Sequence, residues 1–89
     1  MNIELSDQAK EDIAHWNRVD PSRTAKIQRL LQSVMQTPYS GLGKPEPLKH
    51  SLSGYWSRRI NSEHRIVYSV DEEVVRVYVL SIRYYYAGK

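Results

Sequence analysis

The chain has 89 residues, of which 40% are hydrophobic and 26% charged, with no cysteine and a formal net charge of +3. This length allows a single domain over residues 1–89, and the composition is typical of a globular rather than a disordered protein. The lack of cysteine excludes disulfides and thiolate metal sites. The N-terminus does not read as a signal peptide and no apolar run is as long as a membrane span, so we expect a cytoplasmic protein without membrane contact.

The N-terminal half predicts a strand followed by two helices. Ile3 and Leu5 alternate with polar neighbours as in a short strand, and Ser6 is expected to cap the first helix. Asp20-Pro21 predicts the start of the second helix, and Thr37-Pro38 its end. The expected apolar faces of the two helices consist of Ala9, Ile13, Trp16, Ile27, Leu30, Leu31, Val34 and Met35.

The C-terminal half predicts an antiparallel β-meander. After a connector rich in glycine and proline, short β-prone runs separated by turn residues occupy positions 48–50, 55–60, 64–70 and 74–82. The expected fold is therefore α+β: an N-terminal strand, a helical hairpin and an antiparallel meander, with both helices on one face of a four- to five-stranded sheet.

Three-residue turns would pair Arg59 with Arg65, Val70 with Val74 and Val67 with Val77. One sheet face would then be apolar and would pack on the helices: Trp56, Ile60, Ile66, Tyr68, Val70, Val74, Tyr78, Leu80 and Ile82. The opposite face would carry Tyr55, Ser57, Arg59, Arg65, Ser69, Ser81, Arg83 and Tyr85, with Val67, Val75, Val77 and Val79 between them.

The net positive charge lies entirely in this C-terminal half. Residues 41–89 hold eight Lys or Arg against five Asp or Glu, whereas residues 1–40 hold five of each. Like charges directly across a sheet pair are unfavourable, so the Arg59–Arg65 pair suggests a phosphate between them, with solvated surface arginines as the alternative. The candidate RNA-binding residues are Lys44, Lys49, His50, Arg58, Arg59 and Arg83.

Glu46 is the candidate general base. It lies between Pro45 and Pro47, which restrict its backbone, and a carboxylate held near arginines can accept a proton from a hydroxyl. From the residues alone, an exposed loop glutamate or a salt-bridge partner is the commoner role.

Other motifs are less specific. The segment 41–45 has glycines and a lysine but lacks the spacing and the Ser or Thr of a nucleotide phosphate loop, so we reject nucleotide triphosphate binding. The three histidines have no metal-ligand spacing, and we expect His64 to pack against the helices. We therefore predict neither a metal site nor a cofactor. Three tyrosines, at positions 84–86, could stack on an unpaired base or pack at the edge of the core.

Three segments, at residues 43–50, 52–60 and 63–68, closely resemble the YoeB branch of the RelE toxin superfamily, and the likeness extends over nearly the whole chain. The resemblance implies a RelE-like (microbial ribonuclease-type) fold and a toxin of a bacterial type II toxin–antitoxin system. Such a toxin enters the ribosomal A site and cleaves mRNA without a metal. The implied partners are the ribosome, mRNA and a YefM-like antitoxin, with a homodimer as a further possibility.

By the same resemblance, Glu46 would activate a ribose 2′-hydroxyl and Arg65 would stabilise charge on the phosphate, with Arg59 and Lys49 in support. Tyr86 matches the terminal tyrosine that helps to hold the substrate. Tyr85 stands where the family has a histidine general acid. A phenol is protonated at neutral pH but donates its proton with less driving force than imidazolium.

We therefore expect retained but slower cleavage, with Tyr85 as the acid or with electrostatic compensation from Arg83. The alternative function is a toxin fold that binds RNA, the ribosome or the antitoxin and blocks translation without cutting. The change at Tyr85 is the only sequence feature that supports this alternative.

Overall fold

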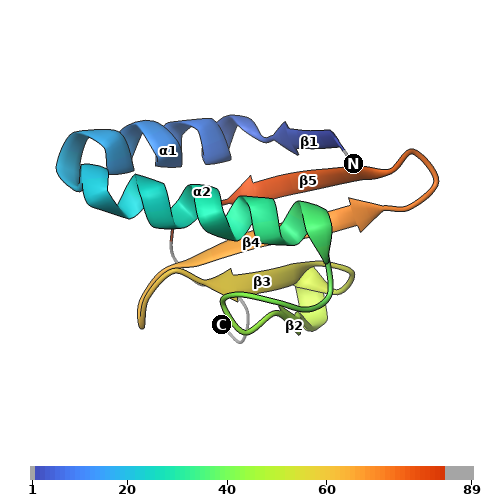
Figure 1. Ribbon diagram of the computed structural model, residues 1–89. Helices are drawn as coiled ribbons and strands as arrows, with labels where there is room; N and C mark the ends of the chain where they lie inside the picture. Colours follow the sequence, from blue (N-terminus) through green and yellow to red (C-terminus); the bar gives the residue numbers. More distant parts are fainter. Residues whose placement is uncertain (1, 84–89) are drawn as a thin grey trace.

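The computed structural model describes residues 2–83, which form one five-stranded sheet with both helices on one face (Figure 1). The strands run in the order β1-β5-β4-β3-β2; β1 is parallel to β5 and the other pairs are antiparallel. The elements are β1 (Asn2–Leu5), α1 (Asp7–Val19), α2 (Pro21–Gln36), β2 (Glu46–Pro47), a 3-10 helix (His50–Leu52), β3 (Trp56–Arg59), β4 (Arg65–Asp71) and β5 (Arg76–Ser81). This architecture confirms the predicted α+β class.

The helix boundaries follow from local chemistry, as predicted. The Ser6 hydroxyl accepts a hydrogen bond from Ala9 N at 3.0 Å and so satisfies one of the unpaired amides at the start of α1. Pro21 occupies the first turn of α2, where its missing N–H costs nothing. The helix ends at Gln36, directly before Thr37-Pro38. No helix within residues 2–83 is long and apolar enough to cross a bilayer.

Helix α1 is fastened to the end of β5 by buried polar groups. Asp12 is 2% exposed and accepts from Ile82 N at 2.9 Å, while Trp16 Nε1 donates to Ile82 O at 3.0 Å. Near the other end of α1, the Ser6 hydroxyl donates to Leu80 O. These three bonds span more than 60 positions in sequence, so they set where the chain leaves the sheet.

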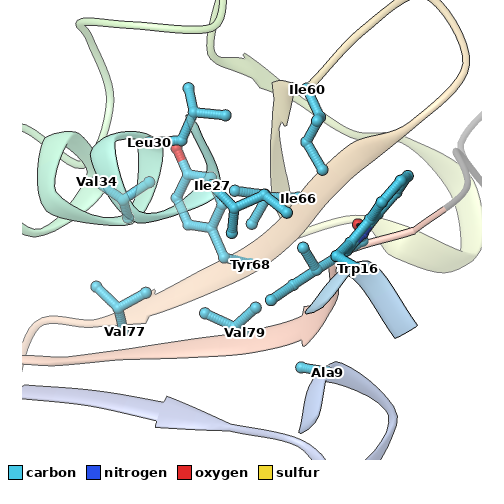
Figure 2. Packing of buried hydrophobic residues seen from close by; sticks show 11 residues of the cluster. Ala9, Trp16, Ile27, Leu30, Val34, Ile60, Ile66, Tyr68, Val77 and Val79 are labelled. Carbon is cyan, nitrogen blue, oxygen red and sulfur yellow. The ribbon is translucent and has the colours of Figure 1, made fainter. Parts of the chain in front are cut away.

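The core lies between the helices and the sheet, and it corrects the predicted register of β5 (Figure 2). Val77 and Val79 are fully buried in this core, whereas the prediction placed Val74, Tyr78 and Leu80 there. The main cluster consists of Ala9, Trp16, Ile27, Leu30, Val34, Ile60, Ile66, Tyr68, Val77, Val79 and Ile82.

Two features cause this shift. Strand β4 extends to Asp71, which pairs with Arg76, so Val70 lies opposite Val77 and the turn takes four residues instead of three. The Asp71 carboxylate organises that turn by accepting from Glu73 N and Val74 N. A register irregularity between Val67 and Tyr68 then places Val67 opposite Ser81. The predicted pairs Val70–Val74 and Val67–Val77 are therefore wrong.

The sheet face away from the helices has a smaller apolar cluster of its own. Leu48 and Val67 are buried there, and Leu52, Tyr55 and Leu80 pack against them. The strand predicted at residues 48–50 is instead the pair Glu46–Pro47, because His50 takes a positive φ of 59° and begins a 3-10 turn. This earlier start of β2 is what brings Glu46 onto the sheet.

Candidate active site

Glu46 lies in β2, directly opposite Ser57 of β3. Side chains of paired residues lie on the same face of an antiparallel sheet, so the carboxylate shares the face of Ser57, away from the helices. The side chain of Glu46 is 46% exposed and therefore remains accessible to a substrate. Glu46, which the sequence predicted to lie in a loop, is therefore a strand residue whose side chain lies on the sheet face away from the helices.

Arg65 of β4 reaches Glu46 of β2 across the strand between them, β3. Ser57 pairs with Val67 and Arg59 with Arg65, so Arg65 is a diagonal neighbour of Ser57, within reach of a long side chain. Arg65 Nη1 donates to Glu46 Oε1 at 2.6 Å and to Ser57 Oγ at 2.9 Å. The side chain of Arg65 is only 10% exposed, so this charge-assisted bond is partly shielded from water.

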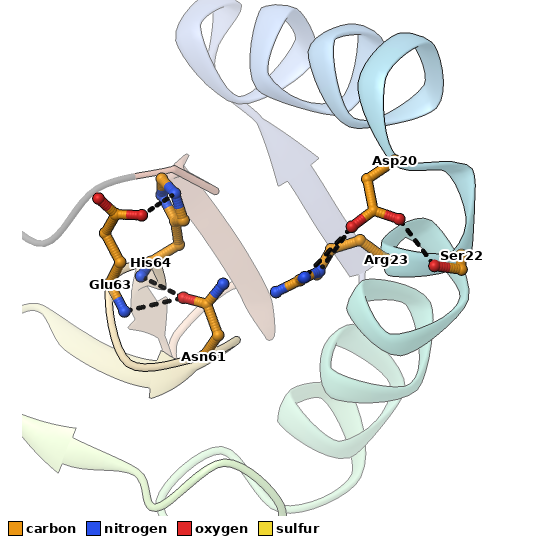
Figure 3. Close-up of polar contacts among 6 residues, drawn as sticks. All are labelled: Asp20, Ser22, Arg23, Asn61, Glu63 and His64. Carbon is orange, nitrogen blue, oxygen red and sulfur yellow. Dashed lines mark hydrogen bonds and ion pairs between the residues drawn. The ribbon is translucent and has the colours of Figure 1, made fainter.

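Strand β4 begins at Arg65, directly after a turn that hydrogen bonds of its own side chains stabilise. Figure 3 shows this turn. Asn61 Oδ1 accepts from both Glu63 N and His64 N, at 2.8 and 2.7 Å. The ring of His64 lies edge-on to Trp16 at 5.0 Å, which confirms its predicted packing role.

Figure 3 also shows Asp20 at the corner between the two helices, where its carboxylate accepts hydrogen bonds from Ser22 and Arg23. The hydrogen bond from the Ser22 hydroxyl lowers the pKa of Asp20, and the hydrogen bond and positive charge of Arg23 lower it further.

The predicted pairing of Arg59 with Arg65 is confirmed by the register. The structure also shows how the two like charges are accommodated. Arg65 turns towards the carboxylate of Glu46, while Arg59 is exposed to solvent. Glu46 therefore supplies the negative charge that the sequence interpretation assigned to a bound phosphate.

Arg58 does not fit the predicted RNA-binding role. It is 0% exposed and points towards the helices, where Tyr68 hydroxyl, Ser33 hydroxyl and three backbone carbonyls accept from its guanidinium. Those carbonyls belong to Thr37, Ser40 and Leu42, at the end of α2 and in the loop after it. Its buried site and structural partners leave no surface for RNA, and strand alternation with Ser57 and Arg59 is the signal that predicts this direction.

The remaining predicted cations surround the sheet at different places. Lys49 and His50 are exposed at the start of the 3-10 helix that follows β2. Lys44 is exposed and faces a hollow beside α2. Arg83 is half-buried after β5. Burial first, and then the positive charge of Arg83, lower the pKa of His15 in α1. Tyr85 and Tyr86 lie outside the described residues.

Ser57 is a site residue that the sequence interpretation did not single out. It is fully buried and accepts from Arg65, so it positions the guanidinium next to Glu46. The sequence signal that could have identified Ser57 is its place on the predicted outer face of the sheet, beside Arg59. Among residues 2–83 there is no group of three or more His, Asp or Glu side chains arranged to hold a metal ion.

A family model described as "YoeB-like toxin of bacterial type II toxin-antitoxin system" matches residues 5–86. The chain belongs to the YoeB-like toxin family. This toxin is 42% identical to Toxin YoeB of Escherichia coli K12 over 86 residues, which cover 97% of this chain and 100% of the relative. It is thus the toxin component of a type II toxin–antitoxin system, as the resemblance implied.

Solved structures agree with this assignment. The YoeB/ParE toxin of Agrobacterium tumefaciens is 42% identical and superposes with a TM-score of 0.92, covering 97% of this YoeB-like chain and 100% of its own. A Staphylococcus aureus protein solved as a YoeB–YefM complex is 42% identical, with a TM-score of 0.85 and coverage of 97% and 98%. A dimer of S. aureus YoeB is 44% identical, with a TM-score of 0.86 and the same coverage.

Proposed function

We propose that this YoeB-like toxin is an endoribonuclease that cleaves mRNA in the ribosomal A site, and therefore acts in the cytoplasm. The observation that carries the proposal is the 2.6 Å contact between Glu46 and Arg65 on an accessible sheet face. It places a proton acceptor and a phosphate-binding cation one hydrogen bond apart. In RNA, the 2′-hydroxyl and the adjacent phosphate are likewise neighbours on one nucleotide.

In the proposed reaction, Glu46 accepts the proton of the 2′-hydroxyl as its oxygen attacks phosphorus. The guanidinium of Arg65 stabilises the negative charge that builds on the phosphoryl oxygens. The bond from phosphorus to the 5′-oxygen then breaks, and that oxygen takes a proton. The products are a 2′,3′-cyclic phosphate and a 5′-hydroxyl, and no step uses a metal.

The contact between Glu46 and Arg65 has to open or be shared when the substrate binds. A phosphate replaces the carboxylate as the partner of the guanidinium, which leaves the carboxylate to accept a proton. Ser57 remains bonded to Arg65 Nη1 and keeps it in place during this exchange. Arg59 and Lys49, both exposed, are proposed to bind neighbouring phosphates.

The proton for the 5′-oxygen is assigned to the C-terminal tyrosines, with Tyr85 as the acid and Tyr86 holding the base. These residues lie outside the described part of the chain, so the assignment rests on the resemblance alone. Arg83 is proposed to supply positive charge near the leaving oxygen.

We propose a YefM-like antitoxin as the cognate partner and a second copy of the chain as a further one. These partners are suggested by the S. aureus relatives, one solved with YefM and one as a dimer. Both S. aureus relatives are more than 40% identical to this chain over nearly its whole length.

Primer extension on an mRNA translated in a cell-free system tests the proposed activity. The wild-type protein should produce new 5′ ends within the translated region, and Glu46→Gln should reduce their rate of formation by about 10²-fold or more. Stalled ribosomes without new 5′ ends would contradict cleavage and would favour a toxin that only blocks the A site.

A further inference from the structure

Strand β5 loses its strand partner on the β1 side shortly before it ends. Strand β1 pairs with β5 only as far as Val79. Three residues further along the chain, two side chains of α1 bind the backbone instead. Asp12 Oδ2 accepts from Ile82 N at 2.9 Å, and Trp16 Nε1 donates to Ile82 O at 3.0 Å. Both backbone polar groups of one residue are therefore held by the same helix, and we call these two bonds the Ile82 clamp.

The Ile82 clamp is buried and its geometry is well defined. The side chains of Asp12, Trp16 and Ile82 are all buried, and Trp16 and Ile82 belong to the main core. Gln8 Nε2 donates to Asp12 Oδ1 at 2.9 Å, so each carboxylate oxygen of Asp12 accepts one N–H. A carboxylate can accept from both donors at once, whereas an amide presents only one oxygen. The bond to Ile82 N is therefore specified by the residue type at position 12.

A buried carboxylate is an expensive way to attach a helix to a sheet. Within residues 2–83, both hydrogen-bond donors to Asp12 are neutral, so no cation offsets the cost of removing its charge from water. Near the start of the same helix, the neutral hydroxyl of Ser6 makes a comparable attachment by donating to Leu80 O at 2.6 Å. The charge of Asp12 is therefore better explained by a need to fix Ile82 than by the docking of α1.

Ile82 lies between the sheet and the residues to which the acid is assigned. The preceding residue, Ser81, pairs with Val67 of β4, and β4 begins two residues before Val67, at Arg65. Neighbouring strands are about 4.8 Å apart, so the chain leaves the sheet beside the strand that carries the phosphate-binding guanidinium. Tyr85 is the third residue after Ile82 and can lie no more than about 11 Å from it. A displacement of about 1 Å in a reacting group can cost about 10²-fold in rate, so the start of so short a segment matters.

We infer that Asp12 and Trp16 are positioning residues for the protonation of the leaving 5′-oxygen. By holding Ile82, they fix the point from which Arg83 and the C-terminal tyrosines follow, so the inference rests on the proposed function. When the bond from phosphorus to the 5′-oxygen breaks, the oxygen keeps the bonding electron pair and takes a proton from the acid. The Ile82 clamp aligns that acid and takes no part in the attack by the 2′-hydroxyl. Its loss should therefore slow the departure of the leaving group and leave mRNA binding unchanged.

The test replaces the leaving 5′-oxygen of the mRNA by sulfur at the mapped cleavage site. A thiol has a pKa of about 8.5, so the sulfur leaves as a thiolate without needing a proton. Single-turnover cleavage of the oxygen and sulfur mRNAs is measured in programmed ribosomes with Asp12→Asn and with Trp16→Phe. Each variant should cut the oxygen mRNA about tenfold or more slowly than wild type, and the sulfur mRNA within about threefold of wild type. The toxin concentration that gives half the maximal rate should stay within about twofold.

The matched control is Ile27→Val, which removes a buried methyl group from α2 in the same core and leaves both bonds to Ile82 intact. It should cut both mRNAs within about twofold of wild type. Wild-type rates in the clamp variants, or an equal loss with both mRNAs, would overturn the inference. Tyr85→Phe should show the same selective loss as the clamp variants, because it lacks the phenol proton. A selective loss in the clamp variants without one in Tyr85→Phe would refute Tyr85 as the acid while supporting the clamp.

Amide hydrogen exchange measures the Ile82 clamp without any substrate. Asp12→Asn should accelerate exchange of the Ile82 amide by about tenfold or more, whereas the amide of Val79, where β1 still pairs with β5, should stay within about twofold. Equal acceleration at both amides would show a general loss of stability and would overturn the inference. A wild-type protein with a protected Ile82 amide that cuts neither mRNA would refute the proposed reaction, and with it the catalytic role of the clamp, while confirming the clamp itself.

Discussion

Replacing Arg58 with methionine should destabilise this protein strongly, although none of its hydrogen-bond partners within residues 2–83 is acidic. Five acceptors surround its guanidinium at 2.6–3.0 Å: Tyr68 hydroxyl, Ser33 hydroxyl and the carbonyls of Thr37, Ser40 and Leu42. Helix α2 has no basic residue in its last turn, so Arg58 supplies from the sheet the positive charge that the helix C-terminus favours.

The expected loss can be estimated from these contacts. Hydrogen bonds to a charged donor contribute about 1.5–3 kcal/mol each when removed singly, but the five are not additive. Removing the guanidinium also removes the cost of burying its charge, and the acceptor carbonyls belong to exposed residues that can regain water. We therefore expect Arg58→Met to lower the free energy of unfolding by about 3 kcal/mol. Arg58→Lys keeps the charge but loses the planar fork, and should cost about 1–2 kcal/mol.

Urea unfolding followed by circular dichroism measures this effect. With a slope of about 1 kcal/mol per molar urea for a domain of this size, the midpoint of Arg58→Met should fall by about 3 M. Arg59→Met is the matched control, because Arg59 is exposed, and it should change stability by no more than about 0.5 kcal/mol. A loss below about 1 kcal/mol for Arg58→Met would refute the view that this arginine fastens the end of α2 to the sheet.

Further predictions concern the reaction and the pH dependence of stability. Glu46→Gln should lower the cleavage rate by about 10²–10⁴-fold and Arg65→Ala by about 10²–10³-fold, measured from new 5′ ends on translated mRNA; wild-type rates in both variants would mean that the site lies elsewhere. Tyr85→His should raise the cleavage rate several-fold if Tyr85 occupies the acid position, and no gain would count against that assignment. Burial raises the pKa of Tyr68 above its usual value of about 10, and Arg58 partly opposes this shift. The unfolded chain therefore loses the phenol proton at a lower pH than the folded protein. Stability should fall as the pH rises from about 10 towards the folded-state pKa. Urea midpoints should show this decline reduced in Tyr68→Phe, and an unchanged decline would show that other groups cause it.

The helical half of the fold could be predicted because its signals are local. The cap at Ser6, the proline at position 21 and the Thr37-Pro38 exit each act within one helical turn, and the structure has the boundaries they predict. The turn between β3 and β4 was predictable for the same reason, and with it the pairing of Arg59 with Arg65.

The last strand could not be placed in this way. Its register depends on a fourth turn residue, which the Asp71 carboxylate stabilises, and on an irregularity beside Val67. Val74 and Val75 read as strand residues by propensity, yet both lie exposed in the turn, and Val75 takes a φ of 54°. Counting along the chain cannot detect such an inserted residue, and one extra residue exchanges the two faces of a strand.

The candidate site was predictable in its chemistry and less so in its geometry. The stiff carboxylate and the arginine pair were visible in the sequence, but their direct contact depends on β2 beginning at Glu46 rather than at Leu48. Arg58 shows the limit of composition, because a basic residue in a basic half of the chain was interpreted as an RNA ligand. Its position in the strand, alternating with Ser57 and Arg59, would have given the better prediction.

The central claim is that the 2′-hydroxyl beside Glu46 and Arg65 attacks the mRNA backbone. The most direct test is cleavage of an mRNA in programmed ribosomes with a single 2′-deoxynucleotide at the mapped cleavage site, compared with the same mRNA in its all-ribose form. Loss of cleavage at that site, with a 2′,3′-cyclic phosphate on the all-ribose product, is the predicted result. Undiminished cleavage of the 2′-deoxy substrate would contradict the mechanism.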